Sequence, residues 1–189
     1  MRLNLGKGGI RALGVAESFK QGQKSSVLAG VVMRGDLVVD GMSLGRTLVG
    51  GDDATASIVG LYRRLRRNDI NVILVSGCIL SLYNFVDTDV LAKKTRLPVV
   101  CLTYKETSGI EGSIRRHFSG NAEEKLKAYG KLGERKRLRL GSGHTVFART
   151  SQISEEEALR VLDLFTKQGS LPEPIKVARL LARAASRRS

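Results

Sequence analysis

The sequence has few of the residues that build cysteine-based scaffolds. It contains two cysteines, Cys78 and Cys101, and their spacing matches no zinc-binding pattern. A chain with so few cysteines is not a disulfide scaffold. We therefore expect both cysteines to be buried packing residues in a protein of the reducing cytoplasm.

Long apolar runs and aromatic residues are also scarce. No apolar run approaches the roughly 18 residues of a membrane-spanning helix, and the start, MRLNLGKGGIR, lacks the apolar segment of a signal peptide. We expect a soluble cytoplasmic protein that does not contact membranes. Five Phe, four Tyr and no Trp argue against a broad stacking platform for single strands. A small base pocket around Tyr83 or Phe85 stays open.

Acidic residues are too few to balance the basic ones. The 189 residues carry 32 Lys and Arg against 18 Asp and Glu, a net charge of +14. Surface ion-pair networks need more matching acids than this chain has. Such an excess attracts polyanions, so nucleic acid is the first partner to consider.

The remaining residues follow the periodicities of an α/β protein. Apolar runs predict strands, and apolar residues three or four apart predict helices. The expected strands cover residues 10–18, 26–33, 37–44, 71–77, 98–104 and 144–150. The expected helices begin at the Asp52-Asp53 pair and cover 86–95, the region of 110–118, and two C-terminal segments that start at Ser154 and Pro172. We expect residues 1–189 to form one domain, with helices at about 154–186 packed on it.

The order of these elements indicates a ribonuclease H-like mixed sheet. Three antiparallel strands come first, followed by a helix and then parallel strands with crossover helices. In that arrangement the first strand lies parallel to the strand after the first helix. The strand ends and the start of the first helix then surround one crevice, which Glu17, Asp52, Asp53 and Ser76 would line.

Three acids in this crevice are candidate metal ligands. Magnesium prefers carboxylate oxygens, and phosphodiester cleavage uses such cations to polarise phosphoryl oxygens and activate water. Glu17, Asp52 and Asp53 have the required chemistry. A purely structural reading is equally available: Asp53 caps the helix, Asp52 lies in the turn and Glu17 is a strand-end charge.

Other polar residues have supporting roles in this prediction. Asn84 and Asp87 follow the central strand and could reach the crevice behind the ligands, although Asp87 could instead cap the next helix. His117 and His144 have no partner at a useful spacing. The last helix places Lys176, Arg179, Arg183 and Arg187 on one face, which is either solvated or in contact with phosphates.

Several segments resemble one known family. The segments that carry this resemblance are IRALGVAESF, VVMRGDLVVDGM, GGDDAT, VILVSGCILSLYNFVD, LPVV and LPEPIKVARLLARA. The chain resembles the archaeal endonuclease dU-like family, formerly a family of uncharacterised proteins, over nearly its whole length. That family is similar to endonuclease V, a metal-dependent nuclease of the ribonuclease H-like fold that acts on deaminated bases.

The resemblance implies a Mg²⁺ or Mn²⁺ site. This chain departs from the family's pattern at two positions of that site. The family has an Asp directly after Gly-Ile on the first strand, where this chain has Ala16, followed by Glu17. The family's Asp-Gly after the central strand is Ser76-Gly77 here. A neutral hydroxyl is a poor substitute for a carboxylate ligand, so the resemblance implies weakened or absent metal binding.

Two hypotheses follow. The first is a metal-dependent endonuclease on uracil- or hypoxanthine-containing nucleic acid, with Glu17, Asp52 and Asp53 as catalytic ligands. In this hypothesis basic residues hold the phosphates, namely Arg115, Arg116, Lys176 and Arg179. The second is an inactive nucleic-acid-binding relative that has lost part of the metal site through Ala16 and Ser76.

Overall fold

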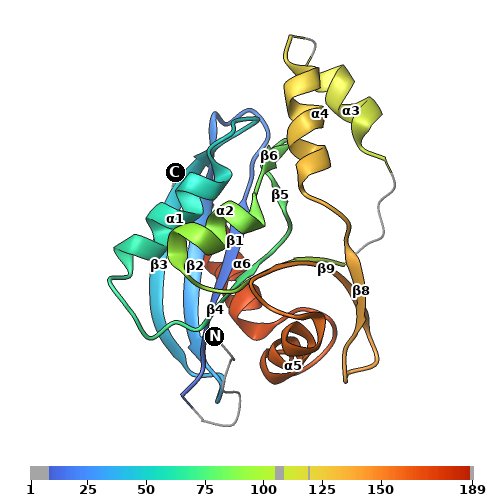
Figure 1. Cartoon of the computed structure of the whole chain (residues 1–189). Coiled ribbons are helices and arrows are strands. Elements are labelled where there is room, and N and C mark those ends of the chain that lie inside the picture. Colours follow the sequence, from blue (N-terminus) through green and yellow to red (C-terminus); the bar gives the residue numbers. More distant parts are fainter. Residues whose placement is uncertain (1–8, 105–108, 119, 188–189) are drawn as a thin grey trace.

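One seven-stranded mixed sheet organises the molecule (Figure 1). The computed structural model describes residues 9–104, 109–118 and 120–187. The sheet has the order β3-β2-β1-β4-β7-β9-β8. Its strands are β1 (Arg11–Ser18), β2 (Ser25–Arg34), β3 (Val39–Leu48), β4 (Val72–Val75), β7 (Val99–Thr103), β8 (Lys136–Arg139) and β9 (Thr145–Ser151).

The strand directions are those of the expected ribonuclease H-like sheet. β1, β2 and β3 form an antiparallel meander, and β4 lies parallel to β1 with Val75 opposite Val15. β7 is parallel to β4, whereas β9 and β8 add antiparallel strands at the far edge. The carboxyl ends of β1, β4 and β7 therefore meet at one edge of the sheet, which confirms the predicted crevice-forming topology.

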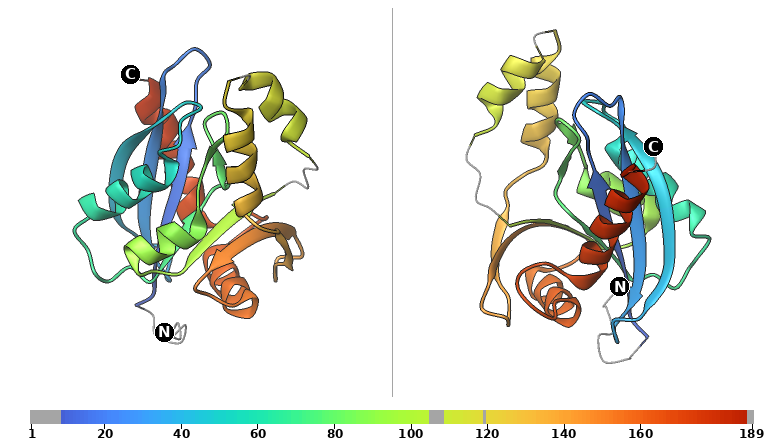
Figure 2. Two further views of the ribbon diagram at one scale, coloured as in Figure 1. Left: turned by 45° about the horizontal axis from the view of Figure 1, so that its top comes forward. Right: turned by 180° about the vertical axis from the view of Figure 1, so that it is seen from behind.

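Helices cover both faces of the sheet (Figures 1 and 2). One face carries α1 (Ala54–Arg64) and α2 (Thr88–Thr95), and the other carries α5 (Glu155–Phe165) and α6 (Glu173–Arg187). α5 begins with the predicted capping box, in which Ser154 and Glu157 bond each other's backbone. Of the described helices, none is long and apolar enough to cross a membrane.

The alternation of side chains along β1 divides the core into two layers. Leu13 and Val15 pack in the cluster under α1 and α2, while Ala16 packs against Ala178 of α6. Successive side chains of a strand point to opposite faces. Glu17 therefore belongs to the α1 face and Ala16 to the α6 face.

Four small elements depart from the expected pattern. The charged segment 122–140, for which no element is predicted, forms α4 (Ala122–Lys131) and β8. α4 packs with α3 (Glu111–His117) beside the sheet. A short hairpin of β5 (Ile79–Leu80) and β6 (Asn84–Phe85) follows β4, and its turn residues 81–83 all have positive φ.

The two cysteines lie under α1 and α2. Cys78 and Cys101 are each 1% exposed, which confirms that they are buried. Their sulfur atoms form a disulfide bond, a pairing that the sequence does not predict.

Candidate functional site

The crevice at the carboxyl ends of β4 and β7 is occupied by an arginine of α6. Arg179 donates from Nε and Nη2 to the hydroxyl of Ser76, at 3.1 and 2.7 Å. Ser76 follows β4 directly. Its hydroxyl therefore accepts a positively charged donor at the position where the resemblance implies a carboxylate.

Close packing of α6 on β1 brings Arg179 to this position. Gly14 of β1 has no side chain, and a Cβ there would lie 2.6 Å from the backbone nitrogen of Ile175 at the start of α6. Ala16 and Ala178 continue this contact with small side chains. A carboxylate in place of Ala16 would have to fit into this apolar contact.

Tyr104 forms one wall of the same site. It follows β7, and its ring centroid lies 5.2 Å from the Arg179 guanidinium carbon, a cation–π contact. The hydroxyl of Tyr104 is buried and has no hydrogen-bond partner within the described part of the chain. Burial raises the pKa of Tyr104 above its ordinary value, and the Arg179 charge offsets only part of that rise.

Glu17 lies in a separate hydrogen-bond network. Its carboxylate accepts from the Ser26 hydroxyl at 2.8 Å and from the backbone nitrogen of Ser81 at 2.7 Å, and the Ser81 hydroxyl also contacts it. Glu17 therefore connects β1 to the left-handed turn of the β5–β6 hairpin. Its partners are hydrogen-bond donors of β2 and of the hairpin turn.

Asp53 lies in a third network, at the N-terminus of α1. Its carboxylate accepts from Asn84 Nδ2 at 2.7 Å, Thr47 Oγ1 at 2.9 Å, the Leu48 backbone nitrogen at 3.0 Å and Ser57 Oγ at 3.0 Å. Partial burial alone would raise the pKa of Asp53, but these hydrogen bonds outweigh it, so the pKa lies below its ordinary value. The carboxylate is ionised at neutral pH and saturated with donors.

Asp53 occupies the N-cap position without capping through its side chain. The Asn84 side-chain oxygen instead accepts from the Ala54 backbone nitrogen at 2.9 Å. The expectation that Asp53 caps α1 through its carboxylate is therefore wrong. Asn84 performs this function because the hairpin carries it against the first turn of α1.

Asp52 pairs with a lysine that the sequence does not single out. Lys125 of α4 donates to Asp52 Oδ1 at 2.6 Å, to the Gly51 carbonyl at 2.6 Å and to the Tyr83 carbonyl at 3.3 Å. The Lys125 side chain is 2% exposed, whereas that of Asp52 is 74% exposed. In the sequence Lys125 is one charge among several on a polar helix, so no pattern distinguishes it.

The three predicted ligands do not converge on one point. Across the described residues, no group of three or more His, Cys, Asp or Glu side chains is placed to hold a metal ion. Each candidate has its own partner, and the crevice residue that contacts Ser76 is a cation. The side chains present therefore do not fit the divalent site that the resemblance implies.

The remaining predicted residues have identifiable partners. Asp87 caps α2 by accepting from the Val90 backbone nitrogen at 2.9 Å. On α3, Arg115 pairs with Glu123 and Arg116 donates to Ser113 at 3.2 Å. Lys176 pairs with Glu173 at 2.6 Å on α6. α3 and α6 lie on different parts of the molecule (Figure 2), so these basic residues form no single patch.

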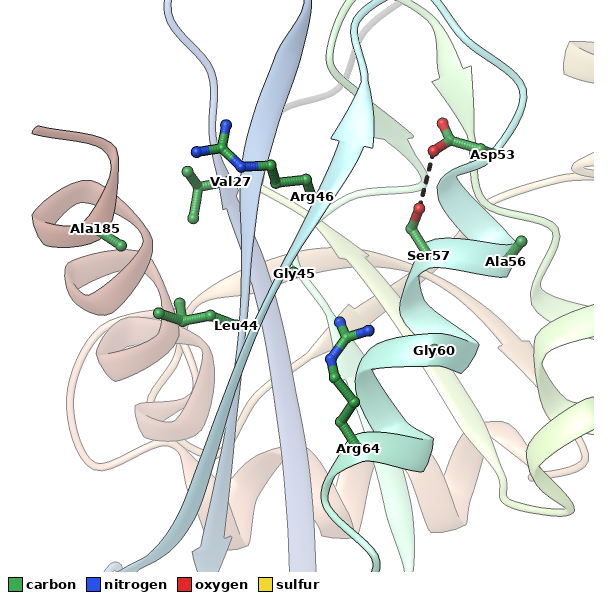
Figure 3. Close-up of a pocket in the computed structure, with 10 residues that line it drawn as sticks. All are labelled: Val27, Leu44, Gly45, Arg46, Asp53, Ala56, Ser57, Gly60, Arg64 and Ala185. Carbon is green, nitrogen blue, oxygen red and sulfur yellow. Dashed lines mark hydrogen bonds between the residues drawn. The ribbon is translucent and has the colours of Figure 1, made fainter. Parts of the chain in front are cut away.

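An open hollow of about 670 Å³ lies between β3 and α1 (Figure 3). Gly45 of β3 and Gly60 of α1 line it, and the Arg64 guanidinium lies over Gly45, where a Cβ would come within 2.6 Å of Arg64 Nη2. Arg64 extends from α1 along it, and the Asp53–Ser57 hydrogen bond closes one end. Its lining has no unpartnered buried polar atom like that of Tyr104, so the crevice is the stronger candidate site.

The chain matches known proteins over most of its length. Residues 8–186 match the family model of endonuclease dU. The chain belongs to this family. A UPF0215 protein of Pyrobaculum calidifontis is 35% identical over 171 residues, which are 90% of this chain and 93% of that protein.

Solved structures share the fold of this endonuclease dU family member. A protein of unknown function from Archaeoglobus fulgidus superposes with a TM-score of 0.78 at 24% identity, covering 93% of this chain and 98% of the other. Endonuclease V of Ciona intestinalis, in complex with a 24mer DNA containing an inosine followed by a ribo-adenosine, superposes with a TM-score of 0.62 at 13% identity. That match covers 95% of this chain and 86% of the other. The predicted similarity to the endonuclease V fold is confirmed.

Tyr104 is the crevice residue that sequence reasoning missed. Its position directly after β7, a buried strand that neighbours β4, could have marked Tyr104 as a residue of the crevice. The pairing of Ser76 with Arg179 had no such signal, because the two residues are 103 positions apart.

Proposed function

We propose that this protein binds nucleic acid at the crevice edge of its sheet and does not cleave it by divalent-metal chemistry. The observation that carries the proposal is the pair of hydrogen bonds from Arg179 to Ser76. A guanidinium in the crevice attracts phosphate and repels a divalent cation. The proposal thus favours the second of the two sequence hypotheses.

Two further findings support a nucleic-acid ligand. The net charge of +14 favours association with polyanions, with an affinity that falls as salt rises. The endonuclease V of Ciona intestinalis, which shares the fold, was solved with DNA bound. Exposed cations away from the crevice, such as Arg115 and Arg116 of α3, would add to this general attraction.

The second candidate function is a metal-dependent endonuclease on uracil- or hypoxanthine-containing nucleic acid. The family's description, endonuclease dU, favours it. Asp52 is the best available ligand for Mg²⁺ or Mn²⁺, because its side chain is largely exposed, unlike the donor-saturated Asp53. Glu17 and Asp53 would have to exchange their present hydrogen bonds for metal bonds.

One paired assay distinguishes the two candidates. Oligonucleotides with and without uracil or hypoxanthine are titrated in rising salt, with EDTA in one series and Mn²⁺ in another, and nicking is followed in the same tubes. We expect salt-sensitive binding in EDTA and no nicking in either series. Mn²⁺-dependent nicking that Asp52→Ala abolishes would establish the endonuclease instead.

A further inference from the structure

Arg179 has neutral partners only. In the described ranges no carboxylate lies within ion-pair distance of its guanidinium, which contacts the Ser76 hydroxyl and the Tyr104 ring. α6 carries Glu173 near its start, but that carboxylate pairs with Lys176. The positive charge of Arg179 is therefore partly buried and has no counter-charge.

The hydrogen-bonding groups around Arg179 have donors to spare. Nε and Nη2 bind Ser76, so Nη1 and the second proton of Nη2 still form one free edge of the guanidinium fork. Ser76 accepts both bonds, which leaves its own O–H free to donate. An anion with several oxygens is the complement that this set lacks.

The fork is also held in position before any ligand arrives. Ser76 fixes one edge of the guanidinium and the Tyr104 ring supports its face, so little rotamer freedom remains to be lost on binding. The free edge lies at the carboxyl ends of parallel strands, where open α/β sheets bind their ligands. Planar, two-point recognition of phosphate is what arginine does better than lysine.

We propose that Arg179, Ser76 and Tyr104 form a phosphate-binding site that takes one backbone phosphate of a nucleic acid without a divalent ion. This inference rests on the proposed function and deepens it. The guanidinium supplies the positive charge that a metal supplies in the resemblance, and the Ser76 hydroxyl donates to a second phosphate oxygen. No bond is broken, so the site binds and positions the strand.

The test compares two arginines of one helix. Arg179→Gln removes the proposed phosphate ligand, and Arg183→Gln removes the same charge from an exposed position one turn further along α6. Affinity for a single-stranded oligonucleotide is measured in EDTA across a salt series. We expect Arg179→Gln to weaken binding by about tenfold or more and to lower the salt slope by about one, and Arg183→Gln to weaken it by less than about threefold.

Two further variants separate geometry from charge. Arg179→Lys keeps the positive charge but removes the two-point donor geometry of the guanidinium. Ser76→Ala keeps the guanidinium but removes the hydroxyl that holds it in position. We expect each to lose affinity by an amount between those of the two glutamine variants. Thermal unfolding of every variant checks that the fold is retained. Full affinity of Arg179→Lys would contradict two-point recognition.

Inorganic phosphate serves as the second probe and separates the possible failures. Equal losses for Arg179→Gln and Arg183→Gln would overturn the site and leave the proposed function standing. In another outcome, inorganic phosphate protects the wild type but not Arg179→Gln against thermal unfolding, and no oligonucleotide binds. That outcome would keep the site and overturn the proposed function. Binding of neither probe, or binding that EDTA abolishes, would overturn the site.

Discussion

Asp53 shows how a single carboxylate can be structural in a position that suggests chemistry. It accepts hydrogen bonds from β3, the β5–β6 hairpin and α1. Its neighbour Asp52 has one strong partner, Lys125. Two adjacent acids that look alike in the sequence therefore have different tasks: one joins three elements, and the other compensates a buried lysine.

Replacing Asp53 by Asn tests this role. The amide places a donor opposite the donors of Asn84 and Thr47, so we expect the free energy of unfolding to fall by about 2–3 kcal/mol. Urea denaturation measures the change. Asp36→Asn, in an exposed turn where Asp36 pairs with Arg34, is the control and should cost less than about 0.5 kcal/mol. Equal losses would contradict a special role for Asp53.

Stability should fall at acid pH because two carboxylates, Asp40 and Asp53, have lowered pKa values in the folded protein. Hydrogen bonds and charge from Arg67 and Arg11 lower the pKa of Asp40 from 3.8 to about 2, and the pKa of Asp53 is also lowered. Because the folded pKa lies below the unfolded one, the stabilisation is fully present above pH 4 or so and is lost as pH falls toward about 2.

Urea midpoints measured between pH 7 and pH 2 check this expectation. The wild type should lose stability mainly below about pH 4. Asp40→Asn removes one of the titrating groups, so the variant should be less stable at pH 7 and its stability should change less with pH. A variant with the full acid dependence of the wild type would refute the assignment to Asp40.

At the scale of elements, the contact between β1 and α6 sets the position of Arg179. Gly14→Ala would drive a methyl group into the backbone at Pro174 and Ile175, so we expect a loss of about 3 kcal/mol in unfolding free energy. Gly60→Ala is the matched control, because its Cβ would enter the open hollow between β3 and α1 and lie at an ordinary contact distance of 3.6 Å from Arg64 Nη1. That change should stabilise α1 by up to about 1 kcal/mol. Chemical denaturation of both variants compares them.

The pairing of α4 with the Gly50–Asp52 loop depends on Lys125. Lys125→Met keeps a long unbranched side chain but leaves the carbonyls of Gly51 and Tyr83 without the Lys125 ammonium as donor. We expect a loss of about 2 kcal/mol and faster amide hydrogen exchange in α4. Lys127→Met, exposed on the same helix, should change neither quantity. Unchanged exchange in Lys125→Met would show that α4 is held by other contacts.

Most helices and strands could be predicted from the periodicity of apolar residues, and a few could not. Strands and helices with strong apolar patterns lie close to their expected positions, such as β2 and α5. α4 and β8 have few apolar residues, so their stability comes from partners across the fold, such as Asp52 for α4. The β5–β6 hairpin is too short to give a pattern, and its positive-φ turn bonds to Glu17, which is 64 positions from Ser81.

At the scale of the whole molecule, excess positive charge and the altered crevice lead to one expectation about ligands. Mg²⁺ or Mn²⁺ at millimolar concentration should leave the melting temperature within about 1 °C of its value in EDTA. An oligonucleotide should raise the melting temperature, because a ligand that binds the folded state stabilises that state. Thermal scans of the wild type in each condition check both statements. A clear upward shift with Mn²⁺ alone would favour a working metal site.

The sequence by itself determined the succession of strands and helices, the positive charge and the family, because periodicity, composition and local motifs are properties of neighbouring residues. The tertiary structure decided what the candidate residues contact. Glu17 faces away from Ala16, Asn84 rather than Asp53 caps α1, and Arg179 reaches Ser76 from 103 positions away. These pairings depend on how the sheet and α6 pack, and packing between distant segments leaves no local pattern in the chain.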